Sequence, residues 1–138
     1  MSNLHYMAGL IDGEGTIGLE RQNATRVFRT PYISLSSTTM GIHMWLQENY
    51  GGSLSTHKTY KANHKPSWVW RLKNLPAIYE LLEGIEPILL EPEKQRRARM
   101  ILWEYPHVTV RNGKYTEQQR QEKFLFEKNF FDPDYKLF

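Results

Sequence analysis

The sequence contains no cysteine, which excludes disulfide bonds, thiolate zinc sites and a cysteine nucleophile. It also has no apolar run approaching the roughly 18 residues that a membrane span needs, so no membrane partner is expected. No basic segment followed by an apolar core opens the chain, so we expect no secretory signal. These absences fit an intracellular protein and do not select its compartment.

What is present is the composition of a globular protein. The chain has 138 residues, of which 40% are hydrophobic and 13% are aromatic. A chain of this length can bury a real core, and neither a linker nor a low-complexity tract divides it. The sequence therefore predicts a single domain over residues 1–138.

Acidic residues are scarce in the middle of the chain. Residues 21–79 carry eight Lys and Arg residues and only one acid, Glu48, whereas residues 1–20 carry three acids and no Lys or Arg. The net charge is only +3. A basic middle fits a nucleic-acid surface, and it fits a mixed solvated surface as well.

Two helix-plus-hairpin units are predicted, followed by further helices. Their apolar residues recur at helical spacing or alternate as in strands. The expected elements are helix 3–12, strands 16–21 and 27–37, helix 40–50, strands 53–60 and 68–72, a helix from Pro76, helix 93–105 ended by Pro106, and helix 116–131. This order, αββαββα at its start, predicts an α+β fold in which helices pack on one face of a four-stranded antiparallel sheet.

The strands alternate between apolar and polar residues, which predicts one buried and one open sheet face. The buried positions are Ile17, Leu19, Ile33, Leu35, Leu54, Trp68, Trp70 and Leu72. The open positions are Thr16, Glu20, Ser34, Ser36, Ser53, Ser55, His57 and Arg71. An open face is common in antiparallel sheets, and a two-stranded ribbon also fits the DNA major groove. We interpret the two tryptophans as core residues rather than as base-stacking ones.

Residues 7–15 read Met-Ala-Gly-Leu-Ile-Asp-Gly-Glu-Gly. Ala8 and Gly9 are small enough for another helix to approach closely. The acids Asp12 and Glu14 lie at the helix C-terminus, where backbone carbonyls have lost their partners. Carboxylate and carbonyl oxygens are ligands that suit Mg²⁺. The same residues also fit a helix that simply stops at a glycine, with incidental acids.

This segment resembles the nine-residue motif of the LAGLIDADG homing endonucleases, with Met7 in place of Leu, and Gly13 and Glu14 in place of Ala and Asp. The resemblance extends over about residues 4–105. Further matching segments are Trp45-Leu46, Tyr50-Gly51-Gly52, Pro66 to Leu72, Ile85-Glu86-Pro87 and Lys94 to Ala98. It implies the homing-endonuclease fold, with a motif helix over about residues 3–14 and a DNA-binding sheet.

The resemblance implies that Glu14 and Lys94 are catalytic. Glu14 would bind Mg²⁺ or Mn²⁺ together with the backbone carbonyl of Gly13, and Asp12 would be structural. Lys94 would lie near the scissile phosphate. Because its match needs about two extra residues before it, Arg96 is the alternative.

A water-positioning residue is also implied at the end of the second strand. Many family members place Gln or Asn there, whereas this sequence offers Ser37 or Thr38.

A single motif implies a homodimer, because one Glu14 cannot serve both strands of a double-strand cut. We expect the motif helices to pair, with an interface at Met7, Ala8, Leu10 and Ile11. The implied activity is that of a divalent-metal-dependent endodeoxyribonuclease, which cuts a long pseudo-palindromic site in intron homing and has no small-molecule substrate. The expected contacts to double-stranded DNA are Thr16, Glu20, Gln22, Arg26, Arg29, Ser34, Ser36, Ser53, Ser55, His57, Lys58, Lys61, Lys65 and Arg71.

Two other interpretations stay open. A non-cutting nucleic-acid binder, either an intron RNA maturase or a DNA-binding regulator, could use the same fold. A small α+β domain that binds proteins would make the basic middle incidental. The family occurs in organelles, archaea, bacteria and phages, and nothing in the sequence selects among these origins.

Overall fold

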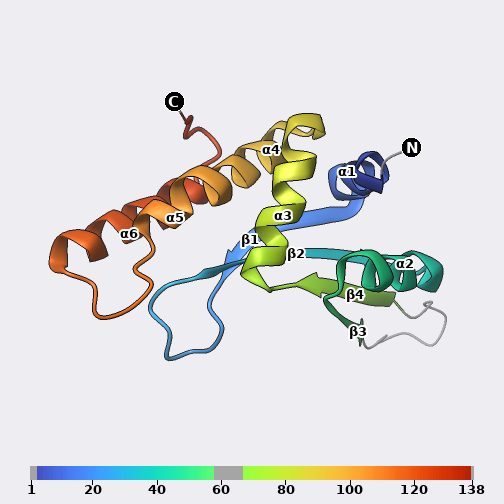
Figure 1. Cartoon of the computed structure of the whole chain (residues 1–138), viewed down its shortest axis with the longest axis horizontal. Helices are drawn as coiled ribbons and strands as arrows, with labels where there is room; N and C mark the ends of the chain where they lie inside the picture. The colour runs from blue at the N-terminus through green and yellow to red at the C-terminus, as the bar shows by residue number, and fades with distance from the viewer. Residues whose placement is uncertain (1–2, 58–66, 138) are drawn as a thin grey trace.

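Two repeats of a helix followed by a hairpin begin the chain, as the sequence predicts. The computed structural model describes residues 3–57 and 67–137. Within them the elements are α1 (Asn3–Glu14), β1 (Gly15–Glu20), β2 (Thr30–Ser37), α2 (Met40–Tyr50), β3 (Ser53–His57), β4 (Ser67–Leu72), α3 (Leu75–Ile85), α4 (Pro92–Arg99), α5 (Tyr105–Val108) and α6 (Glu117–Phe130) (Figure 1). A 3₁₀ turn, Glu86–Ile88, precedes α4, and a π-helical turn, Met100–Glu104, joins α4 to α5.

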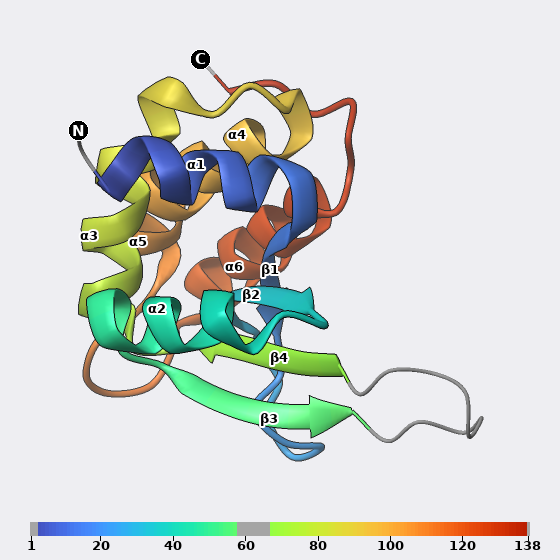
Figure 2. The same cartoon turned by 90° about the vertical axis from the view of Figure 1, so that its right-hand side faces the viewer.

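The four strands form one antiparallel sheet in the order β1-β2-β4-β3. The helices lie on one side of this sheet (Figure 2). In the described part of the chain, no helix covers the other side. The predicted α+β architecture, with one covered and one open sheet face, is therefore confirmed.

The buried sheet face carries the apolar residues that the alternation predicts. Ile17, Ile33, Leu35 and Leu72 are each at most 2% exposed, and Trp70 is completely buried. The indole N–H of Trp70 donates to the carbonyl of Gly51 at 2.7 Å. Trp70 is thus a core residue, as predicted, and it fixes the turn between α2 and β3.

That turn needs glycine for two reasons. Gly51 and Gly52 both have positive φ angles, 75° and 87°. A Cβ atom on Gly52 would also lie 2.6 Å from the carbonyl oxygen of Arg71. A larger residue would therefore displace β4 or distort the backbone.

The prediction that Pro106 ends the helix that begins near residue 93 is wrong, because the chain stays helical to Val108. Proline has no N–H group and its ring clashes with the carbonyl four residues earlier in a regular α-helix. Here a π-helical turn comes directly before it, in which the N–H of Tyr105 donates to the carbonyl of Met100. This wider turn provides room for the proline ring.

Helix α6 carries two buried charged residues, Glu127 and Lys123, and Glu127 anchors the start of β2. Its first turn is closed by a capping box between Thr116 and Gln119. Glu127 accepts hydrogen bonds from the guanidinium of Arg29 at 2.7 Å and from its backbone N–H at 2.9 Å. One turn earlier, Lys123 is 1% exposed, and its ammonium lies 4.1 Å from the centre of the Tyr105 ring.

Burial lowers the pKa of Lys123 from 10.5 to about 8, although Glu127 opposes the shift. Between these two pH values the unfolded chain binds the proton and the folded chain does not, so the free energy of unfolding rises with pH. We expect a gain of about 2 kcal/mol between pH 7.5 and 9.5 from this residue alone. Urea unfolding of the wild type and of Lys123→Met at both pH values measures it. An equal gain in the variant would show that another group is responsible.

Candidate active site and DNA-binding surface

The motif helix leads directly into the first strand, and this junction places Glu14. Met7 and Ile11 are completely buried and anchor α1 against the core. A Cβ atom on Gly15 would lie 2.8 Å from the Cα of Ile11, so only glycine allows the strand to start there. Glu14 is exposed and has no hydrogen bond or ion pair within the described residues. Its carboxylate is therefore free to bind a ligand.

Asp12 has a different environment from Glu14. Its carboxylate accepts hydrogen bonds from the backbone N–H groups of Leu90 and Glu91, both at 3.0 Å. These contacts tie the end of α1 to the segment that starts α4. The geometry gives Asp12 a structural role.

Lys94 and Arg96, the two alternatives for the basic residue, lie in different places. The ammonium of Lys94 donates to the carbonyls of Ile11 and Asp12, each at 2.8 Å, at the end of the motif helix. Arg96 instead donates to the carbonyl of Phe130 at 2.7 Å, at the end of α6. Lys94 is therefore the one of the two that lies beside the motif acids.

A shallow pocket of about 370 Å³ adjoins this junction. Its lining residues come from the start of β1 and from α4 and its cap: Gly15, Thr16, Ile17, Glu91, Glu93, Lys94 and Arg97. Arg97 donates to the carbonyl of Ile17 at 3.0 Å and to Glu93 at 3.0 Å. Sequence reasoning missed Arg97, although its spacing of three from Lys94 places both side chains on one face of α4.

Glu93 is held ionised beside these cations. Hydrogen bonds from Arg96 above all, and then from Arg97, keep the pKa of Glu93 below its ordinary value despite partial burial. Glu93 therefore keeps its negative charge and offsets part of the positive charge of α4.

Ser37 and Thr38 lie at the end of β2, next to the motif. Gly15, the first residue of β1, pairs with Leu35 on β2. Strand β2 continues for two more residues, to Ser37, and these lie alongside the end of α1. The Ser37 hydroxyl accepts the N–H of Thr39 at 3.0 Å, and the Ser37 carbonyl lies 3.2 Å from Nε2 of the buried His43. Thr38 is exposed. Both remain candidates for positioning water.

Cross-strand pairing gathers the predicted polar residues on the open sheet face. One row across all four strands contains Thr16, Ser34, Arg71 and Ser53. In the next row, Ser36 and Ser55 flank Val69. His57 is the last residue of β3.

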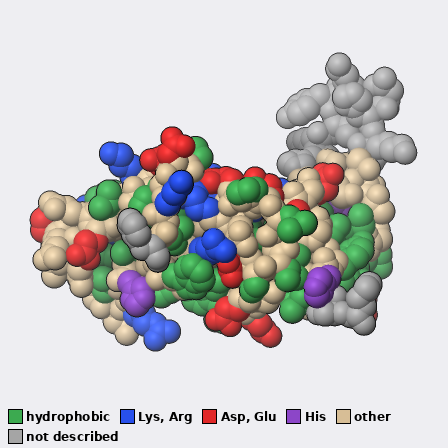
Figure 3. Space-filling view, turned by 90° about the horizontal axis from the view of Figure 1, so that it is seen from above, with side chains coloured by type: hydrophobic (Ala, Val, Ile, Leu, Met, Phe, Trp, Pro, Cys, Tyr) green, Lys and Arg blue, Asp and Glu red, His purple; other side chains and the backbone are tan. Residues whose placement is uncertain are grey.

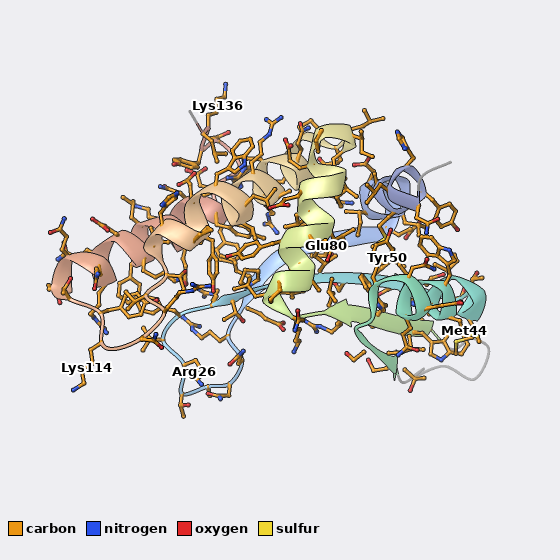
Figure 4. All side chains as sticks on the ribbon, in the orientation of Figure 1. Arg26, Met44, Tyr50, Glu80, Lys114 and Lys136 are labelled. Atoms are coloured by element: carbon orange, nitrogen blue, oxygen red, sulfur yellow. The ribbon has the colours of Figure 1, made fainter. Side chains whose placement is uncertain are left out.

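The predicted charged contacts are distributed unevenly. Gln22 and Arg26 are exposed on the β1–β2 loop, where Arg26 lies away from the helical layer (Figure 4). Arg29 is paired with Glu127 on α6, and its side chain is 30% exposed. Lys58, Lys61 and Lys65 lie outside the described residues. Figure 3 shows the helical side of the molecule, where positive and negative side chains are interspersed.

The expected dimer interface must be corrected. Met7, Ala8 and Ile11 are at most 3% exposed and belong to the core of the protomer, so a partner cannot reach them. The helical period turns Gly9 and Gly13 outward instead, with Leu10 partly exposed beside them. A Cβ atom on either glycine would meet nothing within 4 Å. The exposed face of α1 therefore carries two glycines one helical turn apart, and His5 and Tyr6 are exposed in the turn before them.

No protein-family model and no curated protein matches the sequence, but solved structures match the fold. The group I intron-encoded homing endonuclease I-CeuI, complexed with DNA, gives a TM-score of 0.65 at 17% identity over 96% of this chain and 68% of that chain. The archaeal intron-encoded homing endonuclease I-Vdi141I, complexed with DNA, gives 0.56 at 13% identity over 91% and 95%. I-SmaMI, bound to uncleaved DNA with calcium ions, gives 0.62 at 14% identity over 95% and 45%.

The chain therefore has the fold of the LAGLIDADG homing endonucleases, and the resemblance read from residues 7–15 is confirmed at the level of the fold. It spans nearly all of I-Vdi141I but less than half of I-SmaMI. Among the described residues, no helix has the length and apolar character that crossing a membrane requires.

Proposed function

We propose that this protein is a site-specific DNA endonuclease of the homing type. It makes a metal-dependent double-strand cut as a homodimer, with one active site for each strand. The observation that carries the proposal is the unpartnered carboxylate of Glu14 at the exposed end of the motif helix, two residues after the Asp12 carbonyl that the Lys94 ammonium binds. An acid with no structural partner in such a place is free for chemistry.

The residues at this junction fit a divalent cation. Glu14 offers a carboxylate, and Gly13 is exposed, with open space where a side chain would be. Hard oxygen ligands of this kind suit Mg²⁺ or Mn²⁺. When bound, such an ion supplies charge stabilisation and an acidic water to phosphodiester hydrolysis.

Other residues of the chain would position the reacting groups. Lys94, fixed by two carbonyls, holds a positive charge near the scissile phosphate, where negative charge develops. The hydroxyl of Ser37 or Thr38 would orient the attacking water. Asp12 keeps the motif helix and the start of α4 together, and thereby keeps Lys94 at the end of the motif helix.

A dimer completes the site. Within the described residues, no group of three or more His, Asp or Glu side chains gathers around a single point. Two protomers packed through the exposed face of α1 at Gly9 and Gly13 would bring two Glu14 carboxylates together at the twofold axis. Each sheet would then lie on one half of the DNA, so the target would be nearly palindromic.

Cleavage of a large randomised duplex pool in Mg²⁺, followed by sequencing of the cut ends, tests the proposal. We expect one family of pseudo-palindromic sites, and no cut ends when EDTA replaces Mg²⁺. A pool that the protein retains but never cuts would mean a nucleic-acid binder without nuclease activity. A pool that is neither retained nor cut would contradict any function on DNA.

A further inference from the structure

The geometry of the open sheet face points to a specificity-determining residue. We propose that Arg71, held in place by Glu20 and Tyr32, reads the guanine of one G·C pair in each half of the target. The inference rests on the proposed function, because it assumes that this face lies in the DNA major groove.

Arg71 lies in the interior of the open face. It is on β4, one of the two inner strands, and pairs with Ser34 on β2 and with Ser53 on β3. Both neighbours are small, so neither hides the longer arginine. A ribbon that follows the major groove presents its interior residues to base edges, whereas phosphates run along its rims.

Two contacts hold the guanidinium group in one orientation. Its Nη2 donates to the Glu20 carboxylate on β1, and its central carbon lies 4.8 Å from the centre of the Tyr32 ring on β2. The Tyr32 ring lies close against Gly18 on β1. A Cβ atom at Gly18 would come within 2.7 Å of the ring, so only glycine leaves room for it. The arginine can therefore reach across β2 to Glu20.

The fixed orientation of the Arg71 guanidinium fits base reading better than a contact to phosphate. An arginine whose side chain is already ordered loses less conformational entropy on binding, and its planar fork can donate two parallel hydrogen bonds. Guanine presents such a pair of acceptors, O6 and N7, in the major groove. The Arg71 side chain is 33% exposed, so it is accessible to a base. Its Nε is enclosed, so the donors that can reach a base are Nη1 and the second N–H of Nη2.

Glu20 acts as a positioning residue in this arrangement. A carboxylate on a DNA-facing surface is repelled by phosphates unless cations offset its charge. Glu20 is paired with Arg71 and also with Lys73 at 3.1 Å. It can thus orient Arg71 without a net negative charge at that point.

A binding selection from a randomised duplex pool in EDTA tests the inference without requiring cleavage. For the wild type we expect one G·C pair at the same position of each half-site. Arg71→Lys, which keeps the charge and loses the fork, should lose that preference by about tenfold or more and keep the others. Glu20→Gln should weaken the preference at the same position. The matched control is Arg26→Ala on the β1–β2 loop, away from Glu20 and Tyr32, which should lower the affinity for all sequences alike.

Each other outcome has a distinct meaning. If Arg71→Lys binds every sequence more weakly with all preferences intact, Arg71 contacts phosphate and the inference is wrong. Equal unfolding midpoints of the wild type and the variant exclude misfolding as the cause. If the wild type selects sites without a fixed G·C pair, the inference fails and the proposed function stands. If the wild type retains no duplex, both fail.

Discussion

Replacing Glu14 with glutamine should abolish cleavage and leave DNA binding unchanged. The amide has the shape of the carboxylate but lacks the negative charge that holds a hard cation. Since removal of an essential catalytic group costs on the order of 10³- to 10⁶-fold, single-turnover cleavage of the selected site should fall by that range. Glu14 is exposed and unpartnered, so the free energy of unfolding should change by less than about 0.5 kcal/mol.

Glu48→Gln is the matched control for this change. Glu48 is an exposed glutamate on α2 with no partner among the described residues, and its substitution should leave cleavage at the wild-type rate. Gel-shift titration in EDTA should give the same affinity for all three proteins. Cleavage by Glu14→Gln at a rate near that of the wild type would mean that the metal carboxylate lies elsewhere.

The sequence predicts the sheet because strand periodicity is a local property. Side chains alternate with a period of two, so Ile17, Ile33 and Trp70 are assigned to the buried face from spacing alone, and the structure agrees. The helix at Pro76 follows from an equally local signal, because proline is favoured in the first turn of a helix. Helix α4 differs, because the chain stays helical past Pro106 through a π-helical turn that no local pattern indicates.

The site is only partly predictable, because its geometry depends on contacts between distant segments. Glu14 follows from the motif. The choice between Lys94 and Arg96 depends on which carbonyls each one reaches, and these belong to α1 and to α6. The contact of Tyr32 with Arg71 joins two strands through a register that the sequence does not specify.

The predicted interface face of α1 is wrong for a related reason. Apolar residues mark a helix face that is buried, but they do not tell whether the same chain or a second copy buries it. Met7 and Ile11 pack inside the protomer. The available face is instead marked by glycines, whose lack of a side chain gives no hydrophobic signal.

Gly9→Leu should therefore convert the protein to a monomer and remove double-strand cleavage. Packed helices approach to about 8–10 Å between their axes, and a leucine at the contact would hold two glycine-lined faces apart. Within the protomer the new side chain meets open space, since no atom lies within 4 Å of a Cβ there. Because glycine is a poor helix former, folding should become more stable by about 0.5–1 kcal/mol. Sedimentation equilibrium, thermal unfolding and cleavage of the selected site measure the three effects.

Gly41→Leu on α2 is the matched control, because Gly41 is an exposed helical glycine that also has nothing within 4 Å of its Cβ position. It should keep the dimer and the wild-type cleavage rate. We expect the Gly9→Leu protein to be a stable monomer that binds a half-site weakly and no longer cuts. This result would show that the loss of cleavage comes from the lost dimer and not from misfolding. If Gly9→Leu sediments and cuts like Gly41→Leu, the two Glu14 carboxylates do not meet through α1. The second active site would then have to come from a different face of the molecule.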